Sequence, residues 1–179
     1  MQKLIFSILT LIFWNCNSKS EKRIETKPIN SADLTKILFN QVGADISASV
    51  DVERMNVNEV KDLLKLMITA DQQYRDSLYN GNKKNEAFYW KKLKANDEAN
   101  LKLLDKIIQY HGWPGISKFG EEGASTAWLV VWHHRGRRHI LCRYYNLMEE
   151  AVRNKEMHPI ALKNIDREIA LLSPDQIEY

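Results

Sequence analysis

The chain has 179 residues, of which 44% are hydrophobic and 27% are charged, ordinary values for a globular protein with one core. Its net charge of +3 is too small to indicate nucleic-acid binding by itself, so we expect no nucleic-acid partner. Seven glycines and four prolines leave long stretches without either residue, which favours helices over many short strands.

The N-terminus has the pattern of an export signal. Lys3 precedes an apolar run over 4–14, which is too short to span a bilayer as a stable helix but suits the central part of a signal peptide. Cys16 follows, where bacterial lipoprotein signals place the cysteine that becomes lipidated. We therefore predict a signal peptide at 1–15, with a lipid-anchor cysteine and a polar tether at 16–32.

This signal predicts a membrane-anchored lipoprotein of the cell envelope that faces the periplasm or the outside. Trp14 and Asn15 are bulkier than the small residues usual before a lipidated cysteine, so the alternative is a cleaved signal and a soluble secreted protein. Cys142 is the only other cysteine, and we expect it to pack as a small apolar side chain within a helix.

The remaining residues are predicted to form helices. Residues 33–56 form a short irregular or helical lead-in, with a helix near 33–40. Apolar residues then recur every three or four positions, the spacing of amphipathic helices. The predicted helices span 58–80 with Asn58 as N-cap, then 85–112, about 124–135, 137–154 and 159–173.

These elements predict a single all-α domain at 57–179, a bundle of about five helices. The third helix is apolar on every side over 127–132, so we expect it to be the buried central helix. Gly136 separates it from the fourth helix, and Pro159 suits the first turn of the fifth.

Charged side chains interrupt the apolar stripes of these helices. Asp71 and Arg75 are four residues apart, the spacing and order of a helical ion pair. Asp97 lies on the stripe of the second helix beside Asn100, and His133 ends the apolar third helix. A buried charge without a partner is costly, so we expect such groups to meet. The predicted polar pocket contains Asp71, Arg75, Asp97, His133, Asp166 and Arg167.

The order of several motifs resembles a bacterial family of domains of unknown function. The motifs are "DQQYR" at 71–75, "DEAN" at 97–100, "GWPGISKFGEEGAS" at 112–125 and "IDREIALLSPDQIEY" at 165–179. Family members share a Gly-Trp-Pro turn, a Gln-His-Ala-Asp-like segment, an Asp-Arg pair and a C-terminal Gln followed by Tyr-Gly-Thr. The resemblance implies a helical domain of secreted or anchored proteins and no particular activity.

The chain departs from the family pattern in two places. The Gln-His-Ala-Asp-like segment reads Trp132-His133-His134-Arg135, which keeps the histidine and loses the glutamine and the aspartate. The chain stops at Tyr179, where the family continues with Gly and Thr.

Two interpretations of the polar residues stay open. They form a structural network that fixes the register of the helices, or they form a site. In the second case the ligand-binding candidates are Asp71, Arg75, Asp97, Asn100 and Trp113.

The catalytic candidates are His133, Asp166 and Arg167. A carboxylate from Asp166, or from Asp97 as the alternative, could fix the tautomer of the His133 imidazole and raise its basicity. No Gly-x-Ser-x-Gly motif and no phosphate-binding glycine loop accompanies them.

No complete metal motif is present, because the chain has neither His-Glu-x-x-His nor Glu-x-x-His. His133 and His134 point about 100° apart on a helix, and the arginines of 135–138 repel a cation. We predict no metal and no cofactor, although His133 with Asp97 and Asp166 remains a possible mononuclear site.

The sequence therefore predicts an exported, lipid-anchored helical module that binds a ligand or a protein. Its expected partners are a membrane, through the N-terminal anchor, and an unidentified protein or small anionic ligand. The arginines of 135–138 could clamp an anion or rest on lipid headgroups, but we favour a solvated turn at a helix end. The alternative function is a hydrolase that uses His133 with Asp166 or Asp97.

Overall fold

A computed structural model of the chain describes residues 46–80 and 83–173. Every regular element in those two ranges is a helix, which confirms the predicted all-α bundle. The α-helices are α2 (Ile46–Ser49), α3 (Val57–Asn80), α4 (Glu86–His111), α5 (Ile116–Trp132), α6 (Arg138–Arg153) and α7 (Pro159–Leu171), and the short 3-10 turns are η1 (Val52–Arg54) and η2 (Lys83–Asn85).

The predicted signal peptide, Cys16, the tether and the helix near 33–40 lie outside the described residues, as do the last six residues of the chain. Within the described ranges no helix is both long enough and apolar enough to cross a membrane.

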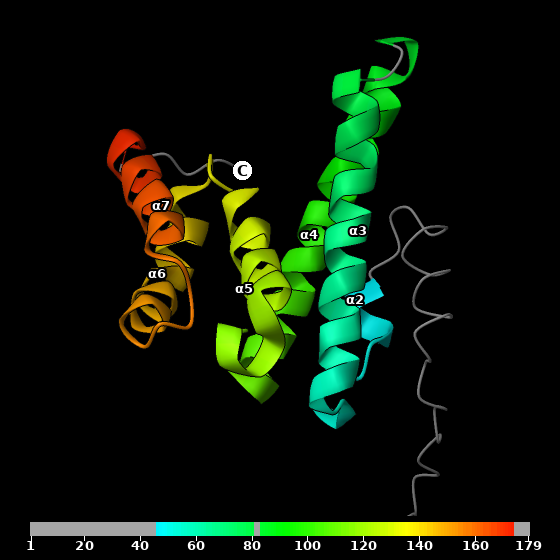
Figure 1. The fold of residues 1–179 in the computed structure, drawn as a ribbon. Coiled ribbons are helices and arrows are strands. Elements are labelled where there is room, and N and C mark those ends of the chain that lie inside the picture. The colour runs from blue at the N-terminus through cyan, green and yellow to red at the C-terminus, as the bar shows by residue number, and fades with distance from the viewer. Residues whose placement is uncertain (1–45, 81–82, 174–179) are drawn as a thin grey trace, which may run out of the picture.

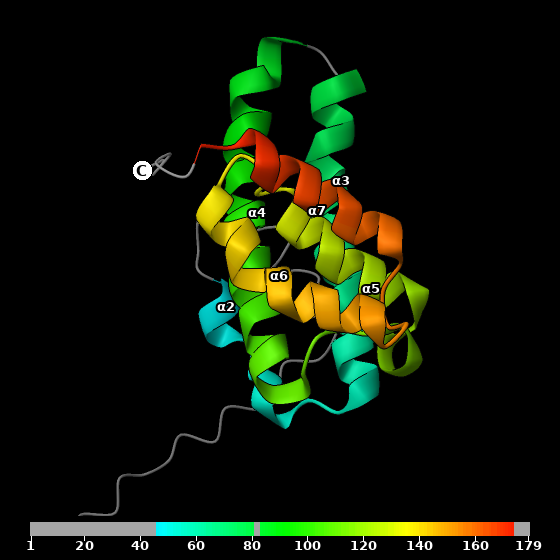
Figure 2. The same ribbon diagram turned by 90° about the vertical axis from the view of Figure 1, so that its left-hand side faces the viewer.

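Two helical hairpins sandwich a central helix. α3 and α4 form a long antiparallel hairpin, α5 packs against both of them, and α6 and α7 form a second hairpin on the other side of α5 (Figures 1 and 2). The buried side chains of all five long helices merge into one core, in which Leu63, Leu104, Val131, Leu141 and Ile165 are fully buried.

The central helix is buried on only part of its circumference. Ala127, Val130 and Val131 are buried, whereas Trp128 and Trp132 are half-buried. α5 is therefore the central helix of the bundle, as predicted, and the two hairpins cover two of its sides and leave a third at the surface (Figure 1). The indole Nε1 of Trp128 donates to the carbonyl of Ala161 at 3.1 Å, which ties this surface strip to α7.

The helix ends differ from the predicted ones where local hydrogen bonds decide them. Asn56, not Asn58, caps α3, because its Oδ1 accepts the Glu59 amide at 3.2 Å while the Glu59 carboxylate accepts the Asn56 amide at 2.7 Å. α5 begins at Ile116 rather than near 124, with a kink where Gly120 adopts φ 77°.

Two further expectations fail locally. The third helix was expected to reach residue 135, but α5 ends at Trp132 and the turn to α6 begins at His133. Cys142 was expected to be packed but is exposed, because the buried side of α6 is formed by neighbours such as Leu141 and Tyr144.

Candidate functional site

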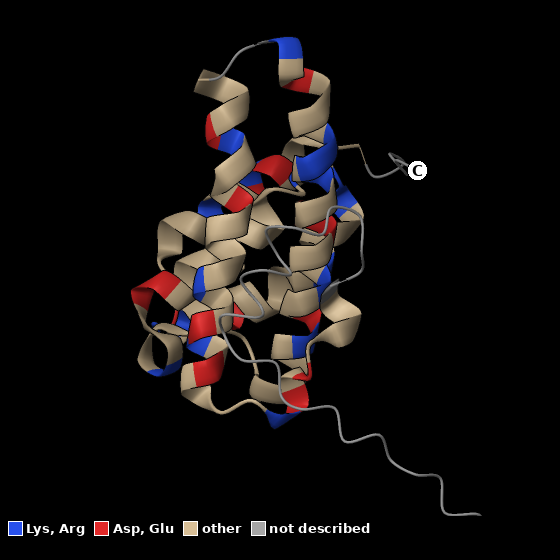
Figure 3. Cartoon of the chain, turned by 90° about the vertical axis from the view of Figure 1, so that its right-hand side faces the viewer, with Lys and Arg blue, Asp and Glu red and all other residues tan. Residues whose placement is uncertain are grey.

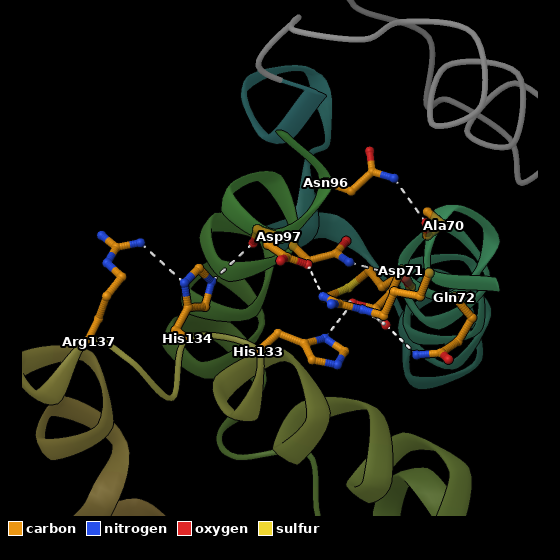
Figure 4. A network of polar contacts seen from close by, with 11 residues as sticks. Ala70, Asp71, Gln72, Asn96, Asp97, His133, His134 and Arg137 are labelled. Carbon is orange, nitrogen blue, oxygen red and sulfur yellow. Dashed lines mark hydrogen bonds and ion pairs between the residues drawn. The ribbon is translucent and has the colours of Figure 1, made fainter. Parts of the chain in front are cut away.

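Polar side chains from three helices meet where α5 ends beside the middle of the α3–α4 hairpin (Figure 4). Asp71 and Arg75 come from α3, Asp97 comes from α4, and His133 follows the last residue of α5. We call these four residues the His133 cluster. Because α3 packs against both α4 and α5, a polar residue on its inner stripe faces the other two helices.

His133 and Asp71 form the most buried pair of the cluster. The His133 Nδ1 lies 2.6 Å from the Asp71 Oδ1, and the two side chains are 7% and 2% exposed. Burial by itself would raise the pKa of Asp71, but the hydrogen bond from His133 and the charge of Arg75 hold it below its usual value. Asp71 is therefore ionised and accepts the Nδ1–H of His133, which leaves Nε2 as the ring nitrogen that faces away from this carboxylate.

Arg75 joins the two carboxylates of the cluster. Its Nη2 donates to the Asp97 Oδ1 at 2.6 Å and to the Asp71 Oδ1 at 3.3 Å, and its Nε donates to the Asp71 Oδ2 at 3.3 Å. Gln72 donates its Nε2 to the same Asp71 Oδ2. The predicted ion pair between Asp71 and Arg75 is thus present, and Arg75 also pairs with Asp97 on α4.

The environment of Asp97 stabilises an ionised carboxylate less well than the environment of Asp71 does. Burial raises the pKa of Asp97 to about 6, against the opposing charges of Arg75 and His133, and the nearby charge of Asp71 raises it further. Two neighbouring carboxylates therefore titrate in different ranges, as acid–base pairs and metal sites often do.

Two asparagines of α4 hold the hairpin together beside the cluster. Asn100, which is 1% exposed, donates to the Met67 carbonyl at 3.1 Å. Asn96 donates to the Ala70 carbonyl at 2.9 Å. Asn100 was a predicted ligand-binding candidate, but its amide nitrogen is bonded to the backbone of α3. Asn96 was missed, although its spacing of four from Asn100 would have placed it on the same face.

His134 anchors the turn after α5 and was also missed by sequence analysis. The residue is 4% exposed, its Nε2 lies 3.3 Å from the Asp97 carbonyl, and its Nδ1 lies 3.2 Å from Nη1 of Arg137 (Figure 4). Burial lowers the pKa of His134, so the ring is neutral and accepts from Arg137 at Nδ1. Arg137 also pairs with Glu98, which fixes this turn against α4.

Three predicted site residues lie elsewhere. Asp166 and Arg167 are exposed on α7, and Asp166 accepts a hydrogen bond from Tyr145, which helps to raise the pKa of that phenol to about 12. His133 therefore pairs with Asp71 instead of Asp166, because α7 packs mainly on α6 and turns Asp166 outward. Trp113 lies before the opposite end of α5, half-buried against the core.

The cluster supplies a possible set of metal ligands. Asp71, Asp97 and His133 each offer one ligand atom, and these atoms lie within 4.8 Å of one another. The sequence predicted no metal, and its open alternative used Asp166 where the geometry offers Asp71.

A shallow groove of about 210 Å³ lies on the exposed strip of α5. Leu129 is one turn before His133 and Ile68 is one turn before Gln72, so the groove lies about one helical turn from the cluster. Its lining is Ile68, Glu122, Ser125, Thr126, Trp128 and Leu129.

Comparison of the chain with models of protein families, with curated proteins and with solved structures finds no match. The resemblance of the segment from about residue 60 to 179 to a bacterial family therefore stays a prediction.

Proposed function

We propose that the chain is an exported, lipid-anchored helical module that binds a divalent metal ion at the His133 cluster. The observation that carries this proposal is the convergence of Asp71, Asp97 and His133 from three helices, with ligand atoms within 4.8 Å of one another. One imidazole and two carboxylates suit Zn²⁺, Mn²⁺ or Fe²⁺, and three protein ligands leave a position for water or a substrate.

The charges of the cluster favour a cation over the small anionic ligand expected from the sequence. Asp71 and Asp97 bring two carboxylates together, and among the described residues Arg75 is the one permanent cation bonded to them. The raised pKa of Asp97 indicates that the ionised form of this carboxylate is poorly stabilised. A divalent ion would stabilise it, whereas an anion would meet two negative groups.

Arg75 is the internal competitor of the metal. Its guanidinium lies against both carboxylates, and the side chain is 13% exposed, so a rotation toward solvent would free Asp71 and Asp97. Removal of the Arg75 charge should therefore strengthen metal binding. A merely structural network would instead lose stability and gain no affinity for a metal.

Thermal unfolding of the full chain with Zn²⁺ or Mn²⁺, against the same sample in EDTA, tests metal binding. At pH 7.5 and a metal concentration about 100 times Kd, the midpoint should rise by about 5–10 °C. His133→Gln should abolish the rise, while His139→Gln, at an exposed position, should keep it. The rise should shrink below pH 6, because Asp97 must release its proton to bind the ion.

Arg75→Gln separates the two roles of the cluster. The proposal expects a larger metal-induced rise in this variant than in the native chain. If neither chain responds to any of the ions, the cluster is not a metal site. If only Arg75→Gln responds, Arg75 is the resident cation and the native function is not metal binding.

A second candidate function is proton transfer by His133, as in the hydrolase alternative with Asp71 in the place of Asp166. The hydrogen bond to ionised Asp71 fixes the tautomer and leaves Nε2 to accept a proton, next to a groove that could hold a substrate. Hydrolysis of small esters that survives EDTA but is lost in His133→Gln would support this candidate over metal binding.

The proposed anchor at Cys16 has its own test. Fatty-acid labelling in a bacterial host should mark the native chain and place it in the membrane fraction. Cys16→Ser should lose both the label and the membrane association, while Cys142→Ser should keep them. An unlabelled native chain in the soluble exported fraction would support the secreted alternative.

A further inference from the structure

The far end of the α3–α4 hairpin carries exposed aromatic side chains. We call residues 76–80 and 83–94 the hairpin tip, and these residues project beyond α5, α6 and α7 in both ribbon views (Figures 1 and 2). Tyr79 is 70% exposed, Phe88 is 53% exposed and Trp90 is 42% exposed. No other described helix covers this end of the hairpin. Such a group of aromatic rings in water is typical of an interaction surface.

The hairpin tip also carries a local excess of basic residues. Its sequence holds five lysines against two acidic residues, Asp76 and Glu86, a local excess equal to the net charge of +3 of the whole chain. Lys91 and Lys94 are exposed, and Figure 3 shows basic positions on the outer part of the hairpin.

A group of aromatic residues is followed directly by a group of lysines along α4. The aromatic residues at 88–90 come first, and Lys91, Lys92 and Lys94 follow within about 6 Å along the helix axis. The Lys92 Nζ lies 5.2 Å from the centre of the Phe88 ring. The rings and the ammonium groups therefore lie at nearly the same level of the hairpin.

We infer that the hairpin tip docks on the surface of a bilayer that contains anionic lipids. Tyrosine and tryptophan prefer the headgroup level of a membrane, and lysines near an anionic surface are attracted to it. The sequence between the two helices, Asn80 to Asn85, has no apolar side chain, so we expect the tip to stay within the headgroup layer. This contact is separate from the proposed lipid anchor and from the His133 cluster.

The distribution of the rings favours a lipid surface over an acidic protein. Phe88 and Trp90 are two residues apart, so they point about 200° away from each other around α4, and both are exposed. Tyr79 adds a third exposed ring on the neighbouring helix. A folded partner would cover one side of the hairpin, whereas a headgroup layer surrounds its end.

Fluorescence of Trp90 tests this docking in the full chain reconstituted on lipid vesicles. The readout is quenching by brominated lipids, taken as the difference between the native chain and Trp90→Phe, so that the N-terminal anchor does not influence it. In vesicles with phosphatidylserine most of the Trp90 emission should be lost, and much less should be lost in pure phosphatidylcholine. The quenching should also fall at 1 M salt, where the Debye length is about 3 Å.

Charge reversals at matched positions provide the control. The double change Lys91→Glu and Lys94→Glu should abolish the quenching of Trp90. The double change Lys61→Glu and Lys65→Glu, at exposed positions near the other end of α3, should leave it unchanged. The inference is overturned if Trp90 emission is the same with brominated and unbrominated phosphatidylserine. It is also overturned if the reversal at Lys91 and Lys94 has no effect.

Discussion

Replacement of Asp71 with alanine is expected to lower the free energy of unfolding by about 3–5 kcal/mol. The Asp71 side chain is 2% exposed and accepts hydrogen bonds from His133, Arg75 and Gln72. Its loss leaves the His133 imidazole without its acceptor and leaves Arg75 with Asp97 alone, in a site that water reaches poorly. Urea unfolding at pH 7 in EDTA, followed by circular dichroism, measures the change, and the thermal midpoint should fall by about 10 °C.

Asp76→Ala is the matched control for this prediction. Asp76 lies on the same helix and is exposed, so its removal should change the free energy of unfolding by less than about 0.5 kcal/mol. Asp71→Asn keeps the shape of the side chain, so its loss of unfolding free energy should lie between the losses of Asp71→Ala and Asp76→Ala. If Asp71→Ala is as stable as Asp76→Ala, then the cluster contributes nothing to the fold.

Asp97 should make the chain less stable as the pH rises from about 4 to about 6. Its pKa is raised to about 6 in the folded chain from 3.8, so in this range the folded chain holds a proton that the unfolded chain has released. Stability from this proton is complete below about pH 4 and is lost as the pH passes the folded value. The loss should be on the order of 2 kcal/mol, and Asp97→Asn should abolish it.

The difference between the native chain and Asp97→Asn isolates this effect. His134 titrates in a neighbouring range with the opposite sign, because burial lowers its pKa and stability from it falls as the pH falls. Asp71, with a lowered pKa, acts only below about pH 4. Urea unfolding of both chains at pH 4.5 and pH 7 gives the comparison. Equal pH dependence in the two chains would contradict the prediction.

The same proton links stability to the proposed metal site. When Asp97 is protonated it offers a neutral acid to Arg75, and when it ionises the cluster gains a second carboxylate next to Asp71. A metal that requires ionised Asp97 should therefore stabilise the chain most where the metal-free chain is least stable. The stability of the metal-free chain and its stabilisation by metal, measured over the same pH range, test whether protonation of Asp97 controls both.

Local patterns were sufficient to predict the helical class and most helix positions. The spacing of apolar residues located α3, α4, α6 and α7 to within a few residues, because this spacing depends only on which face of one helix is buried. It also marked Asp71, Arg75 and Asp97 as polar residues on inward stripes. The cap at Asn56 and the kink at Gly120 were missed, since these depend on individual backbone angles and hydrogen bonds.

Periodicity thus accounts for the positions of α3, α4, α6 and α7 and for the inward position of Asp71 and Asp97. The partners of the charged residues depend on how the helices pack. His133 pairs with Asp71, 62 positions away, and His134 anchors on Asp97, because α5 ends beside the middle of the α3–α4 hairpin. Asp166 lies beside the apolar Ile165 in the sequence but is exposed, since α7 packs on α6. Periodicity shows which face of a helix is buried, whereas the neighbour that covers it is set by packing between distant segments.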